Sequence, residues 1–266
     1  MTTDNSRRLY GIGLVLIILA GGLAGWLVPL DTTERMRGLW LAEMFLLFIF
    51  AFVAGKGITG VWRGLFIDER NKMSLSRLQM ALWTVLLLSA YLTAALFNLR
   101  KGQPDPLSVT LHPALWGLMG ISTVSLVGSP LIKSTKKEAP ASENEEAKTK
   151  SLLTGQGVNL NRVEVQGQLL VNKDPQDASW TDLFKGEEVG NAANLDLGKV
   201  QMFYFTLIIW FAYASSLAAM LKPDVPRIGA FPDVSPCMLA LLAISHAGYL
   251  AVKAVPHTAQ QPSTTP

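Results

Sequence analysis

The chain has 266 residues, of which 50% are hydrophobic and only 16% are charged. A soluble domain typically carries about 25% charged residues, and here the deficit is concentrated in long apolar runs, which favours a membrane-embedded protein. The single cysteine, Cys237, excludes an internal disulfide and a multi-cysteine metal site. A formal net charge of +3 is too small to indicate nucleic acid as a partner.

Six apolar segments are long enough to be membrane-spanning helices, which need roughly 17–25 residues each. In chain order they are 10–30, 39–54, 75–97, 113–132, 200–221 and 236–252, and the second and sixth are the shortest. The first follows Arg7 and Arg8, as a secretory signal would. Because its apolar run is longer than that of a signal peptide, we expect it to remain as an uncleaved helix.

Lysine and arginine are distributed unevenly between the loops on the two sides of these spans. If the N-terminus lies inside, the inner segments hold 17 of the 23 basic residues and the outer segments hold 6. Arg162 and Lys173 lie midway through a long loop and are not counted, which leaves 15 against 6. Because cytoplasmic loops are enriched in basic residues, we expect a bacterial inner (plasma) membrane protein with both termini cytoplasmic.

Two stretches that lie 122 residues apart are nearly the same: RLQMALWT at 77–84 and KVQMFYFT at 199–206. Upstream, W-x-x-L-F-x-x-E occurs twice, at 62–69 and at 180–187. In each copy an N-cap residue, Ser74 or Asp196, precedes the span, and the returning span begins at Pro113 or Pro236. This pattern predicts a parallel duplication of one hairpin, related by a pseudo-two-fold axis along the membrane normal.

The long connection between the two copies divides into two parts. The stretch STKKEAPASENEEAKTK at 134–150 is charged and free of aromatic residues, so it predicts a flexible linker. Alternating apolar residues between Val158 and Val165 then predict two or three short strands, and Ser179 with Asp182 predicts a capping box that starts a short helix. The expected domains are an N-terminal hairpin (1–61), copy 1 (62–133), the linker and small cytoplasmic module (134–179), copy 2 (180–256) and a disordered tail (257–266).

Two sets of repeated residues are the candidate sites. The polar positions shared by the copies either hydrogen-bond between helices, the interpretation we favour, or line a polar path between the copies. These positions are Gln79, Thr84, Tyr91 and Ser122 in copy 1 and Gln201, Thr206, Tyr213 and Ser245 in copy 2. The repeated aromatic segments either sit on lipid headgroups, which is the favoured reading, or form a docking surface of Trp62, Phe66, Glu69, Trp180, Phe184 and Glu187.

Single residues and short motifs give weaker signals. His246 lies within the sixth span and is expected to be a hydrogen-bonded packing residue rather than a proton relay, and Glu43 lies near the outer end of the second span. Gly55 to Gly60 fits G-x-G-x-x-G, but no strand precedes it, so nucleotide binding is rejected. Gly21 and Gly25 have the G-x-x-x-G spacing that allows close helix packing. No protease or hydrolase motif is present, and we expect neither an enzyme nor a cofactor nor a metal site.

The stretches FKGEEVGNAANLDLGKVQMFYFT and LLAISHAGYL resemble a group of bacterial multi-pass inner-membrane proteins to which no activity is assigned. The resemblance covers mainly residues 174–256 and implies no catalytic residue. The expected fold is an all-α integral membrane protein of six helices, with two parallel-repeat hairpins and a small cytoplasmic module of short strands and one short helix. The expected function is a membrane anchor or scaffold with a docking module, and the alternative is a small channel or facilitator. The partners considered are the lipid bilayer, further copies of the chain and a cytoplasmic protein.

Overall fold

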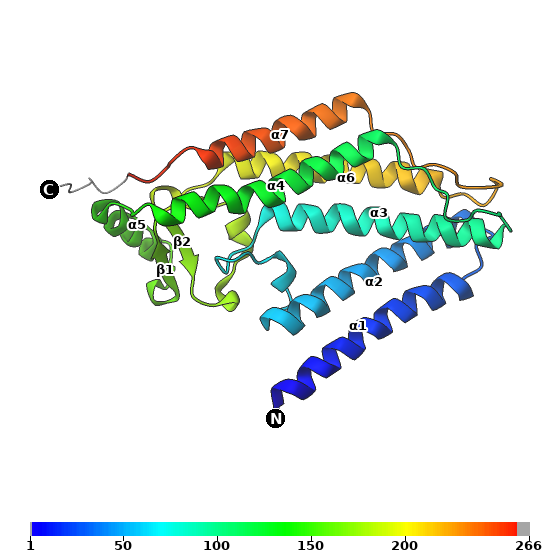
Figure 1. Ribbon diagram of the computed structural model, residues 1–266, viewed down its shortest axis with the longest axis horizontal. Coiled ribbons are helices and arrows are strands. Elements are labelled where there is room, and N and C mark those ends of the chain that lie inside the picture. The colour runs from blue at the N-terminus through cyan, green and yellow to red at the C-terminus, as the bar shows by residue number, and fades with distance from the viewer. Residues whose placement is uncertain (1, 260–266) are drawn as a thin grey trace. The chain divides into compact units, whose positions relative to one another are not determined.

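The computed structural model describes residues 2–259, with side chains from Arg8 onward. Within this range the chain forms seven α-helices and one two-stranded sheet (Figure 1). The helices are α1 (Thr2–Leu27), α2 (Thr33–Thr59), α3 (Leu75–Arg100), α4 (Pro113–Glu138), α5 (Glu143–Gly155), α6 (Leu197–Met220) and α7 (Pro236–Ala254). The strands β1 (Val163–Gln166) and β2 (Leu169–Asn172) form an antiparallel hairpin in which Val163 is paired with Asn172.

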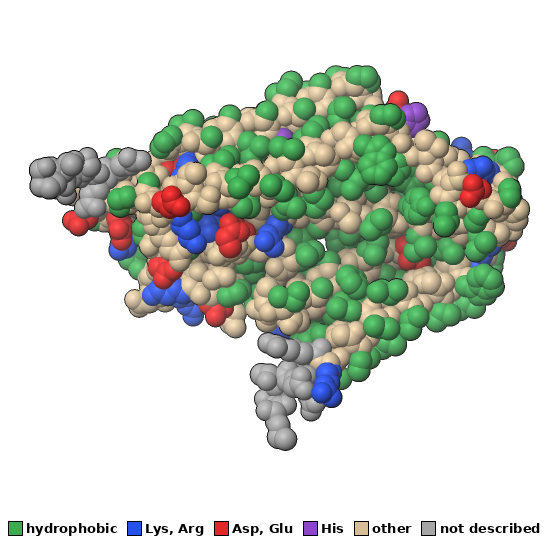
Figure 2. Space-filling model, viewed as in Figure 1, with side chains coloured by type: hydrophobic (Ala, Val, Ile, Leu, Met, Phe, Trp, Pro, Cys, Tyr) green, Lys and Arg blue, Asp and Glu red, His purple; other side chains and the backbone are tan. Residues whose placement is uncertain are grey.

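The prediction of six long apolar helices is confirmed. All the α-helices except α5 are long and apolar enough to cross a membrane. Large hydrophobic side chains such as Leu16, Phe45 and Ile208 are more than half exposed on them, and Figure 2 shows hydrophobic side chains spread along the long helices. Such surfaces suit contact with lipid rather than with water.

The second span is longer than predicted, and its ends have local causes. It begins at Thr33 rather than at residue 39, because the side chain of Thr32 accepts a hydrogen bond from the amide of Arg35. It ends at Thr59, and the C-cap residue that follows, Gly60, has a φ of 78° in the left-handed region and an amide that donates to the carbonyl of Lys56. The capped helix therefore includes polar residues at both ends, which a prediction based only on the apolar run left out.

The chain divides into two compact units. Unit 1 consists of Met1–Leu65, Gln79–Gly120 and Leu207–Ala240, and unit 2 of Phe66–Leu78, Ile121–Thr206 and Leu241–Pro266. The division falls within α3, α4, α6 and α7, so each of these helices contributes residues to both units.

In unit 1, α1 packs on α2, and the two loops that follow α3 and α6 are hydrogen-bonded to each other. Thr110 donates to the carbonyl of Gly229 and accepts from the amide of Phe231. The side-chain amide of Asn98, at the end of α3, both donates to and accepts from the backbone of Ile228. These loops therefore brace the ends of the two helices against each other.

In unit 2, part of the predicted flexible linker forms a helix. α5 packs through Leu153 against Leu170 of β2 and Ala192, which form a small hydrophobic core. The hydroxyl of Thr149 donates to the carbonyl of Val189 at 2.7 Å. The expectation of a flexible segment overlooked Leu153, which lies just beyond the charged stretch and provides the apolar contact that orders it.

Two loops of unit 2 have matching local geometry. The amide of Ser74 donates to the carbonyl of Phe66, and the amide of Asp196 donates to the carbonyl of Phe184. Inside each loop lies one isolated antiparallel bridge, Ile67 with Met73 in the first and Lys185 with Leu195 in the second. Each loop therefore closes on itself immediately before a long helix begins. The capping box of Ser179 and Asp182 is also confirmed, and it starts a short 3₁₀ turn at Trp180–Leu183.

Candidate functional site

Eight charged side chains that are distant in sequence lie buried together in unit 2. Each has an exposed side-chain fraction of 11% or less. They are contributed by the 66–74 loop, α4, the 184–196 loop, α6 and α7. We name this set the ion cluster, and it consists of Asp68, Arg70, Lys133, Lys136, Glu187, Glu188, Lys199 and Lys253.

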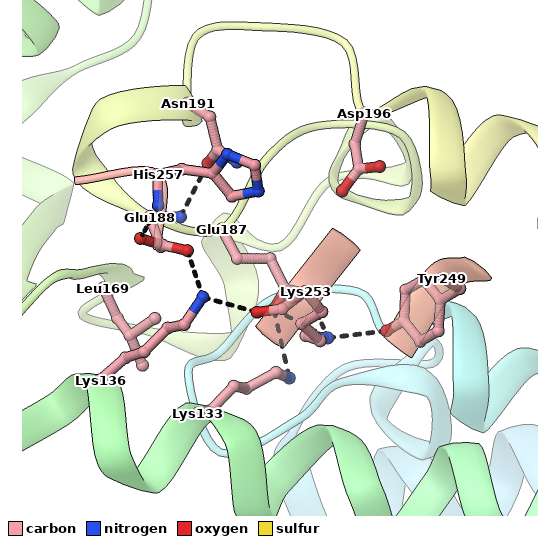
Figure 3. A pocket seen from close by; sticks show the side chains of 10 residues that line it. All are labelled: Lys133, Lys136, Leu169, Glu187, Glu188, Asn191, Asp196, Tyr249, Lys253 and His257. Carbon is pink, nitrogen blue, oxygen red and sulfur yellow. Dashed lines mark hydrogen bonds and ion pairs between the residues drawn. The ribbon is translucent and has the colours of Figure 1, made fainter. Parts of the chain in front are cut away.

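Glu187 is the centre of the ion cluster. Its carboxylate lies 2.8 Å from Nζ of Lys253, 3.1 Å from Arg70 Nη2, 3.1 Å from Nζ of Lys199 and 3.9 Å from Nζ of Lys133. Figure 3 shows Lys133 from α4 and Lys253 from α7 converging on it. One carboxylate therefore joins a loop residue to three helices.

Asp68 is the second acceptor for two of these cations. Nζ of Lys133 donates to its carboxylate at 2.6 Å, and Arg70 donates to the same oxygen at 2.8 Å through Nη2 and at 3.1 Å through Nε. The tight loop that carries this pair places Asn71 at a φ of 55°, where asparagine is tolerated better than most residues. The side chain of Asn71 donates to the carbonyl of Asn172, so the end of β2 holds this loop in place.

Lys136 and Glu188 tie the end of α7 to the same region. Nζ of Lys136 donates to Glu188, to the carbonyl of Lys253 and to the carbonyl of Val255. A cation there satisfies carbonyls that a helix C-terminus leaves free. The other oxygen of Glu188 accepts from the amide of His257 at 2.8 Å. Residues 257–259, predicted to belong to a disordered tail, are thus hydrogen-bonded, whereas 260–266 lie outside the described residues.

Burial and ion pairing act in opposite directions on the acids of the ion cluster. Burial alone would raise the pKa of Asp68 and Glu187, but the neighbouring cations outweigh it and hold both pKa values well below their usual range. Burial would likewise lower the pKa of Arg70, yet Glu187 and Asp68 raise it. Each of these three groups is therefore charged at neutral pH.

Lys72 behaves differently from its neighbours in the same loop. Burial, reinforced by the charge of Arg70, lowers the pKa of Lys72 to about 8, and Asp182 restores it only in part. A fraction of this amine is therefore neutral near physiological pH.

A small cavity lies beside the ion cluster. Its volume is about 20 Å³, and Lys136, Glu187, Glu188 and Lys253 are among the residues that line it (Figure 3). This space holds about one water molecule, so it does not accommodate an organic substrate.

A stripe of buried polar side chains on α4 and α7 leads to the ion cluster. Oγ of Ser125 lies 2.6 Å from Nδ1 of His246, and Nζ of Lys253 donates to Ser129 at 2.5 Å and to the Tyr249 hydroxyl at 2.7 Å. The two helices are in ordinary van der Waals contact at Gly128, where an added Cβ would lie 3.6 Å from the side chain of Leu250. We name this set the polar stripe, consisting of Ser122, Ser125, Ser129, Ser245, His246 and Tyr249.

The predicted repeat positions are only partly brought together. Ser122 and Ser245 are both buried in the polar stripe, and their hydroxyls have no hydrogen-bond partner among the described residues. Gln79 is buried but Gln201 is exposed, and likewise Thr206 is buried whereas Thr84 is half-buried. The hydroxyl of Tyr91 donates to the carbonyl of Leu107 and that of Tyr213 to the carbonyl of Pro232, so each tyrosine fastens the loop that follows its own helix.

The six residues of the predicted docking surface differ in exposure. Trp62, Glu69 and Trp180 are exposed, whereas Phe66 is buried and contacts Trp180 with ring centroids 6.2 Å apart. Phe184 is half-buried and packs edge-on against Phe203 at 5.1 Å. Glu187 lies in the ion cluster. Only the first three are therefore accessible to a partner.

Sequence reasoning missed the ion cluster because its lysines were counted only for topology. One signal was available: Ser122, Ser125, Ser129, Lys133 and Lys136 recur at spacings of three and four, which place them on one face of a helix. A polar stripe of this kind in an apolar helix indicates a buried polar interface.

The fold and the site define a class: a mostly helical protein with six helices long and apolar enough to span a membrane, plus a small two-stranded sheet. No family model matches the chain, and neither a curated protein nor a solved structure is similar to it.

Proposed function

We propose that the protein is a non-enzymatic multi-pass protein of the bacterial inner membrane that holds a rigid cytoplasmic module for a partner. The length and apolarity of six helices and the excess of basic residues on one side support this proposal. In this arrangement both termini and the ion cluster are cytoplasmic. A reporter fused after Thr265 is expected to read cytoplasmic, and a periplasmic signal would contradict the proposed topology.

The observation that carries the proposal is the ion cluster. Glu187 lies in the segment between α5 and α6, at the start of the predicted copy 2, and it forms ion pairs with lysines of α4, α6 and α7. A flexible tether would not need ion pairs to the helices. Burying a charge costs desolvation energy, which is offset only when the charge has well-placed partners. The ion cluster therefore favours a module whose orientation on the helices is fixed, as expected of a scaffold that presents a surface.

The proposed internal duplication is consistent with this arrangement. The paired loop closures at Ser74 and Asp196 support two copies of one unit, each a loop followed by a capped span. In the second copy the repeated glutamate, Glu187, has become the centre of the ion cluster, whereas its counterpart Glu69 is exposed. The two copies have thus diverged in role, because only the glutamate of the second copy forms the ion pairs that hold its loop against the helices.

Trp180 is the residue through which we propose that the module contacts its partner. It is 51% exposed, and it is the first residue of the capped turn Trp180–Leu183. A photo-crosslinking amino acid at Trp180 is expected to yield a protein adduct in cells, and the same group at exposed Asn161 serves as the matched control. Adducts with lipid alone at position 180 would contradict a docking role and favour headgroup contact.

The second candidate function is a small facilitator, and the polar stripe is the observation that favours it. Ser122, Ser245 and Nε2 of His246 provide buried polar atoms with no hydrogen-bond partner among the described residues, which suit water or a small solute. The test is flux of ions and small solutes through liposomes that contain the full chain. Flux that decreases in the Ser125→Val variant would support this candidate. Absence of flux across a broad panel of solutes would contradict it and leave the anchor function as the remaining candidate.

A further inference from the structure

Glu43 is a carboxyl group buried within unit 1. It lies on α2, where α1 packs, and it is only 2% exposed. Its Oε1 has no hydrogen-bond partner among the described residues. Oε1 of this carboxyl group is therefore buried without a donor from the described part of the chain.

The backbone of α1 lies close to this carboxyl group at Gly21. A Cβ added at Gly21 would lie 2.8 Å from Oε2 of Glu43, so alanine at this position would displace the end of the Glu43 side chain. At Gly25, one turn later, an added Cβ would lie 2.2 Å from Cδ1 of Leu96 on α3. The G-x-x-x-G spacing therefore allows packing within the chain. Gly21 contacts the acidic side chain of Glu43, whereas Gly25 contacts the hydrophobic side chain of Leu96.

A second buried polar atom without a partner lies on the same face of α2. Nε1 of Trp40 has no hydrogen-bond partner among the described residues, and Trp40 is 4% exposed. Residues three apart on a helix share a face, so an unpaired donor and an unpaired acceptor occur within one turn. Buried polar atoms are nearly always satisfied, which points to a small polar species at this position.

The basic groups of the neighbouring elements are occupied elsewhere. On α2, Arg35 pairs with Asp31, Arg37 donates to the carbonyl of Ala218, and Lys56 donates to that of Gly60. At the end of α3, Arg100 donates to the carbonyls of Gly25, Trp26 and Val28. Lys101 donates to the carbonyl of Pro223, and Arg8, the basic residue of α1 whose side chain is described, is exposed. None of these bonds or ion pairs among the described residues involves Glu43.

We propose that Glu43 is a proton-binding site within the candidate span, where the carboxyl group is held in its neutral form. An unpaired carboxylate this deeply buried is strongly disfavoured, whereas the neutral acid needs no counter-charge. The acid also supplies an O–H, so one water molecule can bridge it to Nε1 of Trp40. The ligand class is thus the proton, and this site is independent of the anchor function.

A hydrophobic carbodiimide, dicyclohexylcarbodiimide, is the probe for this state. The carboxyl proton passes to one nitrogen of the reagent while the carboxylate oxygen bonds to its central carbon. The resulting O-acylisourea rearranges to a stable N-acylurea, and no atom leaves. The full chain in liposomes is treated over a range of pH, and the modified residue is located by peptide mass spectrometry.

We expect an adduct at Glu43 that decreases as the pH rises and is absent in Glu43→Gln. Glu34, which is exposed in the first turn of α2, is expected to remain unmodified by this reagent and to react with a water-soluble carbodiimide instead. Gly21→Ala is expected to change the rate of the Glu43 reaction several-fold, whereas Gly22→Ala, with no atom near the added Cβ, leaves it unchanged. No Glu43 adduct at any pH, or equal modification of Glu34 and Glu43 by the hydrophobic reagent, would overturn the proposal.

Discussion

Replacement of Glu187 by glutamine tests the ion cluster most directly. Glu187→Gln keeps the shape of the side chain and one carbonyl oxygen but removes the charge that faces Arg70, Lys133, Lys199 and Lys253. Asp68 remains as the nearby acid, and it contacts only Arg70 and Lys133. Lys199 and Lys253 therefore lose their anionic partner while they stay buried.

The magnitude follows from the cost of an uncompensated buried charge. Removal of one partner from a buried ion pair destabilises a protein by about 3–5 kcal/mol. Domains of 150–250 residues lose about 2–4 °C in Tm for each kcal/mol, so a decrease of roughly 6–20 °C is expected. Lys199 also donates to the carbonyls of Asp182 and Lys185, which keeps the loss from being larger.

The assay is thermal unfolding of the purified full chain in detergent, with Glu69→Gln as the matched control. Glu69 occupies the equivalent position in the first W-x-x-L-F-x-x-E segment but is exposed, so its replacement should change stability by less than about 0.5 kcal/mol. Equal Tm values for Glu187→Gln and the wild type would refute the role assigned to the ion cluster.

The same acids make stability depend on pH in a defined direction. The pKa values of Asp68 and Glu187 in the folded protein lie below their ordinary values of about 3.9 and 4.3. Their contribution is therefore fully present above about pH 4.3 and is lost as the pH falls through the lowered pKa values. Glu187→Gln should show a shallower loss of stability in acid than the wild type, and a parallel curve would contradict this.

Three further predictions concern single side chains. Lys72→Met should raise the free energy of unfolding near neutral pH by up to roughly 3 kcal/mol, because a pKa of about 8 means that the folded protein disfavours the charged amine. Thermal unfolding of the wild type should show a gain in stability from about pH 8 to about pH 10, and the variant should not show this gain. Asp196→Ala should cost about 1 kcal/mol in thermal unfolding, since its carboxylate caps α6 by accepting from the amide of Lys199 at 3.1 Å. Ser125→Ala should cost about 1–3 kcal/mol, because it leaves Nδ1 of His246 buried without its partner; an unchanged melt would contradict the 2.6 Å contact.

The sequence by itself determined those features that depend on local order along the chain. The six long helices follow from the length of the apolar runs, and the capping box at Ser179 follows from residue types three positions apart. The start of α6 next to Asp196 was predicted in the same way, and its cap is formed. Such signals act over a few residues, so they do not require knowledge of the path of the chain.

Only the tertiary structure decided which charges meet. Lys133 and Asp68 are 65 residues apart and Lys253 and Glu187 are 66 apart, and no local pattern couples them. Glu69 and Glu187 occupy the same place in a repeated motif, yet one is exposed and the other is surrounded by four cations. The physical reason is that the energy of a charge depends on burial and on distances of a few ångströms, which the folding of the loops sets and the spacing of residues along the chain does not.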